Sequence, residues 1–124
     1  MELAFEQLTK QAESLLRSDI SAEQAVCVLT GNGNVRWFLN HDIMSGNTSD
    51  EAAFIESLKE GGDTGVRYAV CMWRDFWLDV PSWHLRERLV QLNASNRETE
   101  VLLRGGDGFV VKPLKVMVPP GTDR

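Results

Sequence analysis

The sequence has few basic residues and no long apolar run, and both shortages limit what the protein can bind. Lys and Arg together number 13, against 18 Asp and Glu, so the formal net charge is -5. Surfaces that neutralise a nucleic-acid backbone need clustered Lys and Arg, and we therefore expect no such binding. The apolar runs are shorter than the roughly 18 residues of a membrane-spanning helix. Because "MELAFEQLTK" also has acids where a signal peptide has bases, we expect a cytoplasmic protein that is not bound to membranes.

Cysteine is also scarce, with Cys27 and Cys71 as the only two. Both lie in apolar runs, where cysteine usually behaves as a small buried hydrophobe. A reducing cytosol disfavours disulfides, so we expect none between them. With 124 residues and a hydrophobic content of 43%, the chain is long enough for one core. We therefore expect a single domain over residues 1–124.

Apolar periodicity and turn residues predict alternating helices and strands. Residues 3–17 have the spacing of an amphipathic helix, and residues 25–40 read as a hairpin around a Gly and Asn turn. A capping-box pattern at its start and two glycines at its end predict a second helix at 48–62. An apolar run at 65–73 predicts a central strand, and Pro81 suits the first turn of a third helix. Residues 99–104 predict a strand, and 108–118 a short strand or helix. The order α-β-β-α-β-α-β predicts an α/β fold with a mixed sheet of about five strands and helices on its faces.

Three stretches carry a resemblance to a known family. The helix starts "TSDEAAFIESLKEGG" and "VPSWHLRERLVQL", with the ending "TEVLLRGGDGFVVKPLKVMVPP", resemble the small cytidine deaminases over about Leu3 to Pro120. This resemblance implies a three-layer α-β-α fold. In that family a His or Cys, two residues before a glutamate, and a P-C-x-x-C segment hold a zinc ion, while the glutamate moves the proton.

The family's zinc ligands do not have counterparts here. The match aligns the glutamate with Glu51 and the proline with Pro81, but the three ligand positions become Ser49, Ser82 and Leu85. Serine hydroxyls are poor zinc ligands, and leucine cannot coordinate a metal. We therefore expect no zinc and no other cofactor, and we lean against an enzyme.

Three residues near these positions are candidate substitute ligands. Asp50 and His84 each lie one residue from a lost ligand, and Cys71 could lie near the same end of the sheet. Neighbouring helix positions point about 100° apart, which disfavours such a substitute site. An active deaminase or hydrolase with a non-standard metal site remains a distant alternative.

Glu51 has two interpretations. It is either a vestigial acid–base residue or the last member of a capping box that begins at Thr48, and the capping interpretation is favoured. The family binds ribose through an Asn-x-Glu motif, which "FLNHDIM" matches in part through Asn40 and Asp42. An Asn and Asp pair at a strand end is equally an ordinary turn signal. If a ligand binds, we expect it near Asn40, Asp42 and Glu51, with Trp83 and His84 beside them.

Tryptophan is abundant, with four residues at positions 37, 73, 77 and 83. We expect Trp83 to occupy part of the former zinc corner. The other tryptophans either anchor an interface between copies of the chain or are structural, in which case Trp73 ends a buried strand and Trp77 covers the core. The family's closed assemblies, together with these aromatics, predict a homo-oligomer, either a dimer or a tetramer.

Two functions follow from these observations. The first is a catalytically degenerate, cytidine deaminase-like module that binds a nucleoside, nucleotide or related small molecule. The second is a structural or interaction domain that acts as a homo-oligomer. Fold analogy alone cannot choose between them.

Overall fold

A computed structural model describes residues 2–117 of the chain; Met1 and residues 118–124, including Pro120 and the end of the last predicted element, lie outside the described residues. The helices and strands alternate in the predicted order. They are α1 (Leu3–Ser18), β1 (Gln24–Thr30), β2 (Val35–Asn40), α2 (Ser49–Glu60), β3 (Val66–Trp73), β4 (Leu78–Asp79), α3 (Trp83–Leu92), β5 (Glu100–Arg104) and β6 (Phe109–Pro113). Short 3-10 helices follow β2, α3 and β6, at Ile43–Ser45, Ala94–Glu98 and Leu114–Met117.

The strands form one mixed sheet, as predicted. Its order is β2-β1-β3-β5-β6, and the short β4 pairs with β3 off this path. The β3–β5 pair is parallel, and the other pairs are antiparallel. The sheet thus has six strands, because the two-residue β4 adds one that is too short to show a period in the sequence.

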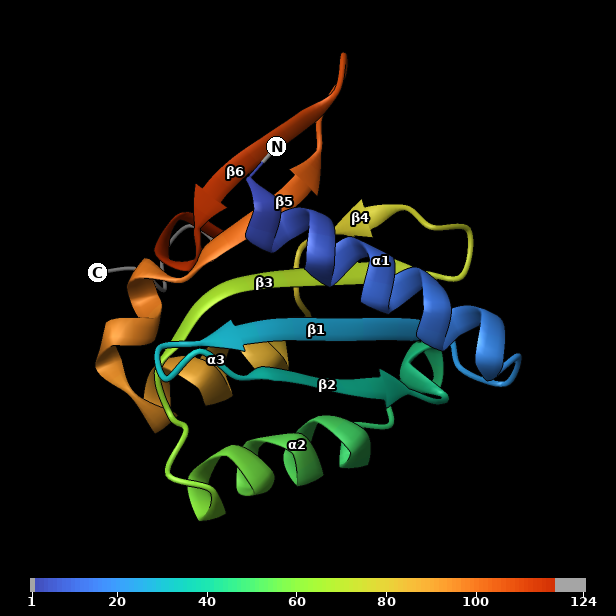
Figure 1. The fold of residues 1–124 in the computed structure, drawn as a ribbon. Helices are drawn as coiled ribbons and strands as arrows, with labels where there is room; N and C mark the ends of the chain where they lie inside the picture. Colours follow the sequence, from blue (N-terminus) through green and yellow to red (C-terminus); the bar gives the residue numbers. More distant parts are fainter. Residues whose placement is uncertain (1, 118–124) are drawn as a thin grey trace.

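Helices cover both faces of the sheet, which confirms the three-layer arrangement (Figure 1). The alternation of β1 explains the layers, since neighbouring side chains on a strand point to opposite faces. Ala25 and Cys27 pack with the apolar side of α1, whereas Val26 and Val28 pack with Phe54 of α2 and Leu85 of α3. Within residues 2–117, no helix has both the length and the apolar character needed to cross a membrane.

The two cysteines are free and buried. Cys27 lies in the core on the α1 side, and Cys71 lies in the core on the side of α2 and α3. Because their side chains point to opposite faces of the sheet, the two thiols cannot approach each other as a disulfide requires. The expectation of two unpaired cysteines is therefore confirmed.

The starts of α2 and α3 lie close together on one face of the sheet. Their proximity is fixed by a hydrogen bond between residues that are 31 positions apart, Ser82 before α3 and Glu51 in the first turn of α2. This meeting of two helix starts positions the candidate site.

Candidate functional site

Glu51 is the central polar group of the candidate site. Its side chain is completely buried, at 0% exposure, although it carries a carboxylate. The hydroxyl of Ser82 donates to Glu51 Oε2 over 2.5 Å, and the same oxygen of Ser82 accepts the backbone N–H of Leu85 over 3.1 Å. Ser82 thereby caps the start of α3 and holds Glu51 at the same time.

The favoured capping interpretation of Glu51 is wrong. Thr48 does occupy the position before α2, but its side chain makes no cap hydrogen bond. Glu51 instead turns into the molecule toward Ser82. Ser82, which precedes α3, thus takes the place of the local partner that the sequence pattern predicted for Glu51. The sequence of α2 alone could not identify Ser82 as the partner.

Three further side chains come from the sheet face beneath these helix starts. Gln24, Asn40 and Cys71 share the face that packs on α2 and α3, because Gln24 lies opposite Asn40 and Val26 lies opposite Cys71. Asn40 Nδ2 donates to Gln24 Oε1 over 2.8 Å. We name the set Gln24, Asn40, Glu51, Cys71 and Ser82 the α2–α3 corner.

Two acceptor atoms of the corner lack a donor. Among the described residues, Glu51 Oε1 and Asn40 Oδ1 are both buried and have no hydrogen-bond partner. Buried polar atoms are almost always paired, and leaving one unpaired costs roughly 1–3 kcal/mol. The corner can therefore accept hydrogen bonds from a group that carries N–H or O–H donors.

The electrostatics of the corner are those of a buried site. Burial raises the pKa of the Cys71 thiol well above its usual value, and the nearby Glu51 carboxylate raises it further. Arg86 opposes this shift in part, and burial lowers the pKa of Arg86 itself. One nitrogen of Arg86 donates to the carbonyl of Met117, while its buried Nε has no partner among the described residues. Because its pKa is raised well above the usual value, the Cys71 thiol remains protonated at neutral pH.

The donors at the three family ligand positions do not fit zinc. Ser49 is exposed, and its hydroxyl donates to Asn47 Oδ1 over 2.8 Å. Ser82 is engaged with Glu51 and Leu85, and the Leu85 side chain lies in the core at 1% exposure. Neutral hydroxyls and an aliphatic side chain supply none of the thiolate or imidazole ligands that zinc prefers.

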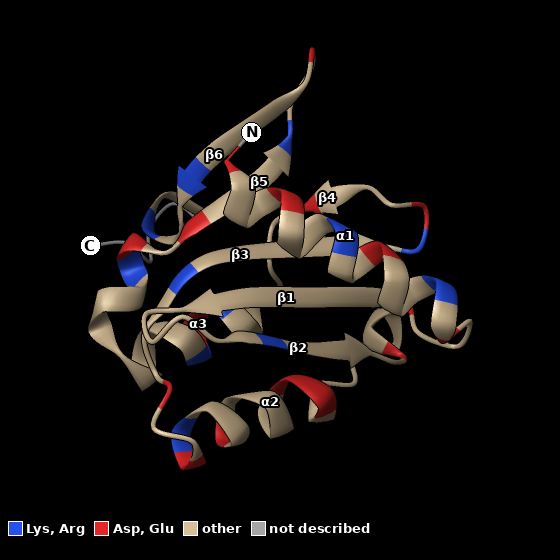
Figure 2. Ribbon diagram, in the orientation of Figure 1, with Lys and Arg blue, Asp and Glu red and all other residues tan. Residues whose placement is uncertain are grey.

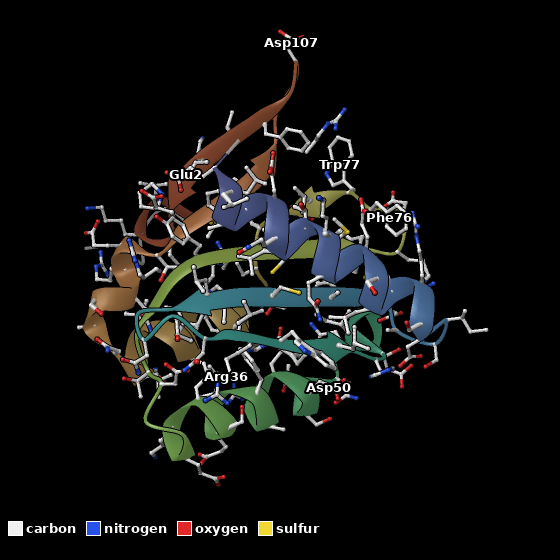
Figure 3. All side chains as sticks on the ribbon, viewed as in Figure 1. Glu2, Arg36, Asp50, Phe76, Trp77 and Asp107 are labelled. Atoms are coloured by element: carbon white, nitrogen blue, oxygen red, sulfur yellow. The ribbon has the colours of Figure 1, made fainter. Side chains whose placement is uncertain are left out.

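The substitute ligands do not come together either. Asp50 accepts the backbone N–H of His41 over 2.8 Å and contacts its ring nitrogen Nδ1 at 3.3 Å, and Figure 3 shows Asp50 at the start of α2. His84 is exposed and meets the ring of Trp83 edge-on. Over residues 2–117, no group of three His, Cys, Asp or Glu side chains is arranged to hold a metal ion.

His41 is bound on both sides by acids. Its Nε2 lies 3.1 Å from Asp19 Oδ2, opposite the contact with Asp50. The hydrogen bond to Asp19 is the main cause that raises the pKa of His41 above 6.5. Hydrogen bonds from Ser21 and then His41 lower the pKa of Asp19 to about 2. The cluster ties the end of α1 to the start of α2.

The remaining predicted ligand residues, Asp42 and Trp83, are exposed. Asp42 is exposed and has a left-handed backbone with φ of 60°. Trp83 is 44% exposed, so its indole is not enclosed in the interior. Trp77 is 49% exposed.

Sequence reasoning missed Gln24 and Arg86, whereas Cys71, which was expected near the same end of the sheet, does lie near Glu51. Gln24 could have been found, because it is the polar end of the apolar run "QAVCVL" and alternation places it on the face of Val26 and Val28. Arg86 lies one helical turn after Ser82, but its position near Cys71 depends on packing between α3 and the sheet. Neither signal separates a site residue from an ordinary structural one.

Comparison with known proteins gives a clear result for the fold only. The sequence matches no protein-family model and no curated protein. Among solved structures, the chain is similar to cytidine deaminase from Mycobacterium leprae, with 16% identity over 95% of this chain and 99% of that one, at a TM-score of 0.69. It is similar to the enzyme from Mycobacterium tuberculosis, with 15% identity over 96% and 97% of the two chains, at a TM-score of 0.68.

A third similar structure is the cytidine deaminase from Burkholderia pseudomallei. Its identity is 14% over 97% of this chain and 98% of that one, with a TM-score of 0.66. Such identities establish a shared fold and leave the chemistry open, because one fold serves many functions. The chain therefore has a cytidine deaminase-like fold over nearly its whole length.

Proposed function

We propose that this chain binds a nucleoside, nucleotide or related small molecule at the α2–α3 corner and does not deaminate it with zinc. The observation that carries the proposal is Glu51 Oε1, a buried carboxylate oxygen without a hydrogen-bond donor among the described residues. An amino or ring N–H group of a ligand would supply that donor. The resulting charge-assisted hydrogen bond would be stronger than one between neutral groups.

Asn40 supports a second contact with the same ligand. Its amide nitrogen is committed to Gln24, while Oδ1 remains free to accept a sugar hydroxyl. Trp83 and His84 present exposed rings on α3, where a base could stack. Asp42 is exposed and would contact only a part of the ligand that extends outward. Because Glu51 is completely buried, ligand entry requires local opening of the corner.

The donor set argues against zinc-dependent catalysis. The Ser82 hydroxyl donates a hydrogen bond to Glu51. The neutral hydroxyl of Ser49 and the aliphatic side chain of Leu85 are not strong metal ligands. Without a metal to lower the pKa of water, a glutamate alone provides little of the family's chemistry. We therefore propose a binding protein of the cytoplasm, built on a deaminase fold and lacking that activity.

A thermal-shift panel of nucleosides and their 5′-phosphates tests this function. A ligand that binds only the folded state at 100 times its Kd stabilises it by about 2.7 kcal/mol. The shift should disappear in Glu51→Gln, in which an amide nitrogen replaces an acceptor oxygen, and should persist in Glu56→Gln, whose side chain is exposed on the same helix. No shift with any panel member at millimolar concentration would refute the proposal.

A second candidate function rests on a different region. The β5–β6 hairpin exposes Phe109, Val110 and Val111, and Trp77 is exposed nearby. Clustered exposed apolar side chains mark interaction surfaces. A homo-oligomeric interaction domain therefore remains a candidate, and it is compatible with ligand binding because the hairpin and the α2–α3 corner share no residue.

A further inference from the structure

The sheet has an open edge at β6. This strand is the last in the sheet order and, within residues 2–117, pairs only with β5. The hairpin projects away from the helices that cover the rest of the sheet (Figure 1). Phe109, Val110 and Val111 are each between 41% and 49% exposed, although their residue types are usually buried. An open edge strand is a template on which another extended chain can pair.

The hydrogen bonds between β5 and β6 decide which backbone groups of β6 remain open. The two strands pair in one unbroken register. At the turn, Gly105 N–H donates to the carbonyl of Gly108 over 2.6 Å. At the other end, Leu114 N–H donates to the carbonyl of Thr99 over 2.8 Å. Because hydrogen-bonded pairs recur at every second residue of an antiparallel ladder, the even-numbered residues of β6 turn their backbone groups toward β5.

The odd-numbered residues of β6 therefore turn their backbone groups to the open edge. Phe109 and Val111 each present an N–H donor and a C=O acceptor there. Pro113 presents only its carbonyl, because proline has no N–H. A strand added beside β6 would bond to these groups, and the five residues of β6 set its length. The edge thus fits a short extended peptide, whose pairing ends at Pro113.

A groove of about 490 Å³ lies on the α1 side of this edge. It is lined by the buried side chains of Phe5 and Leu102 and by the exposed side chains of Phe109 and Val111. Residues that lie directly opposite each other on neighbouring strands point to the same face of a sheet. The residues of an added strand that pair with Phe109 and Val111 would therefore point to the groove side. Apolar side chains at those alternate positions would cover both.

The other two residues that line the groove are acidic. They are Glu2, which Figure 3 labels beside the hairpin, and Glu100, at the red start of β5 in Figure 2. Neither carboxylate has an ion-pair partner within residues 2–117. Glu100 lies opposite Pro113, so the next strand outward would lie about 10 Å from it, which a long basic side chain and the glutamate span together. The groove therefore complements a peptide that carries a base at this end.

A second copy of this chain fits the edge less well than such a peptide. The only base of β6, Lys112, points away from the groove, because alternate residues of a strand face opposite sides. The groove side of β6 carries Phe109, Val111 and Pro113. A copy that paired through its own β6 would therefore bring no base to Glu100.

We propose that β6 binds an extended segment of another protein as an added strand, and that this segment has apolar residues at alternate positions and a Lys or Arg next to Glu100. Backbone hydrogen bonds to Phe109 and Val111 supply affinity, and the groove selects the side chains, as in other cases of strand addition. The proposal does not depend on ligand binding at the α2–α3 corner. A copy of this chain on the same hairpin, as in the second candidate function, is the competing occupant.

Peptides selected from a random library displayed on phage serve as probes, and fluorescence anisotropy measures their Kd as free peptides. We expect the selected peptides to have apolar residues at alternate positions and a Lys or Arg. Single backbone nitrogens along a selected peptide are then methylated in turn. Methylation should weaken binding by about tenfold or more at every second residue and little between, because only alternate N–H groups of an added strand face β6. This measurement requires no change in the protein.

Substitutions on β6 and β5 test the same contact from the side of the protein. Val111→Pro removes an outward N–H and leaves the bonds to β5, since proline is tolerated on an edge strand where the N–H faces solvent. It should weaken peptide binding by about tenfold or more, whereas the matched control Val111→Ala keeps the N–H and should weaken it by no more than about threefold. Glu100→Gln should cost a peptide with a base about threefold in affinity. Circular dichroism and melting temperature check that the variants are folded.

The outcomes separate the edge, the charge and the occupant. The proposal is overturned if the parent selects no peptide, if a folded Val111→Pro variant binds the peptides as tightly as the parent, or if the methylation series shows no period of two. If Glu100→Gln leaves the affinities unchanged, the assigned basic residue is wrong. Sedimentation velocity tests the competing occupant. A parent oligomer that the folded Val111→Pro variant dissociates would show that the edge takes a second copy, which also overturns the proposal.

Discussion

The α2–α3 corner and the β5–β6 hairpin depart from the usual rule of burial in opposite directions. The corner buries a carboxylate and an amide with unpaired oxygens, and the hairpin exposes a phenylalanine and two valines. Stability alone would favour paired polar atoms inside and fewer large apolar side chains outside. Residues that break such local rules often serve a function. The comparison therefore separates a candidate binding site from a candidate interface.

The two regions also differ in what holds them in place. The corner depends on contacts between distant segments, such as Ser82 with Glu51 and Asn40 with Gln24. The hairpin depends on neighbouring strands and a tight turn between them. Changes at the corner should therefore affect the whole fold, whereas changes at the hairpin should act mainly on association.

The largest expected effect comes from removing the apolar side chain beneath the corner. Leu85→Ala should lower the free energy of unfolding by roughly 2–5 kcal/mol, because it leaves a cavity in the core. Val111→Ala, at an exposed position of the β5–β6 hairpin, should change the free energy of unfolding by no more than about 0.5 kcal/mol. Urea denaturation at low protein concentration measures both. Equal losses in the two variants would erase the proposed contrast between the regions.

A smaller effect is expected from the serine that joins the two helices. Ser82→Ala removes the cap of α3 and the donor to Glu51, and should cost roughly 2–4 kcal/mol. Ser49→Ala is the matched control, since Ser49 is also at a helix start but is exposed, and its side chain hydrogen-bonds to the nearby Asn47 and not to Glu51. The same denaturation measurement applies. A Ser82 variant as stable as the Ser49 variant would show that the hydrogen bond to Glu51 contributes little.

The smallest effect concerns pH. The raised pKa of His41 means that its contacts with Asp19 and Asp50 add full stability below about pH 6.5, and that this contribution is lost as pH rises through the folded-state pKa. His41→Asn should therefore lose more stability, relative to the parent, at pH 5.5 than at pH 8. His84→Asn controls for removing an exposed histidine. Urea midpoints at the two pH values give the answer, and a His41 loss independent of pH would contradict it.

Much of the fold was predictable because local signals agree with the tertiary structure. The periodicity of residues 3–17, the Gly and Asn turn, and Pro81 all led to elements that the structure contains. Pro81 was expected in the first turn of the third helix, but it lies just before the N-cap residue Ser82, and α3 begins at Trp83. β4 was missed because two residues carry no period, and its pairing with Met72 and Cys71 is a tertiary feature. The mixed sheet followed from the order of the elements.

The site was less predictable, since its contacts join segments far apart in the chain. Thr48 and Glu51 have the spacing of a capping box, but in the structure Glu51 accepts a hydrogen bond from Ser82, which lies at the start of another helix. Asn40 proved to be buried, while its predicted companion Asp42 is exposed. The roles assigned to Asn40, Asp42, Glu51, Trp83 and His84 stay predictions until ligands are tested.

Zinc binding by a repaired site tests the central claim most directly, namely that the corner keeps the deaminase geometry without its ligands. Equilibrium dialysis compares the parent with the triple variant Ser49→His, Ser82→Cys, Leu85→Cys, and with the same variant carrying Trp83→Gly. The account predicts about one zinc per chain in a folded variant, in tetrahedral coordination with one open position, and no stoichiometric zinc in the parent. About one zinc bound to the parent, or folded variants that bind zinc no better than the parent, would contradict the account.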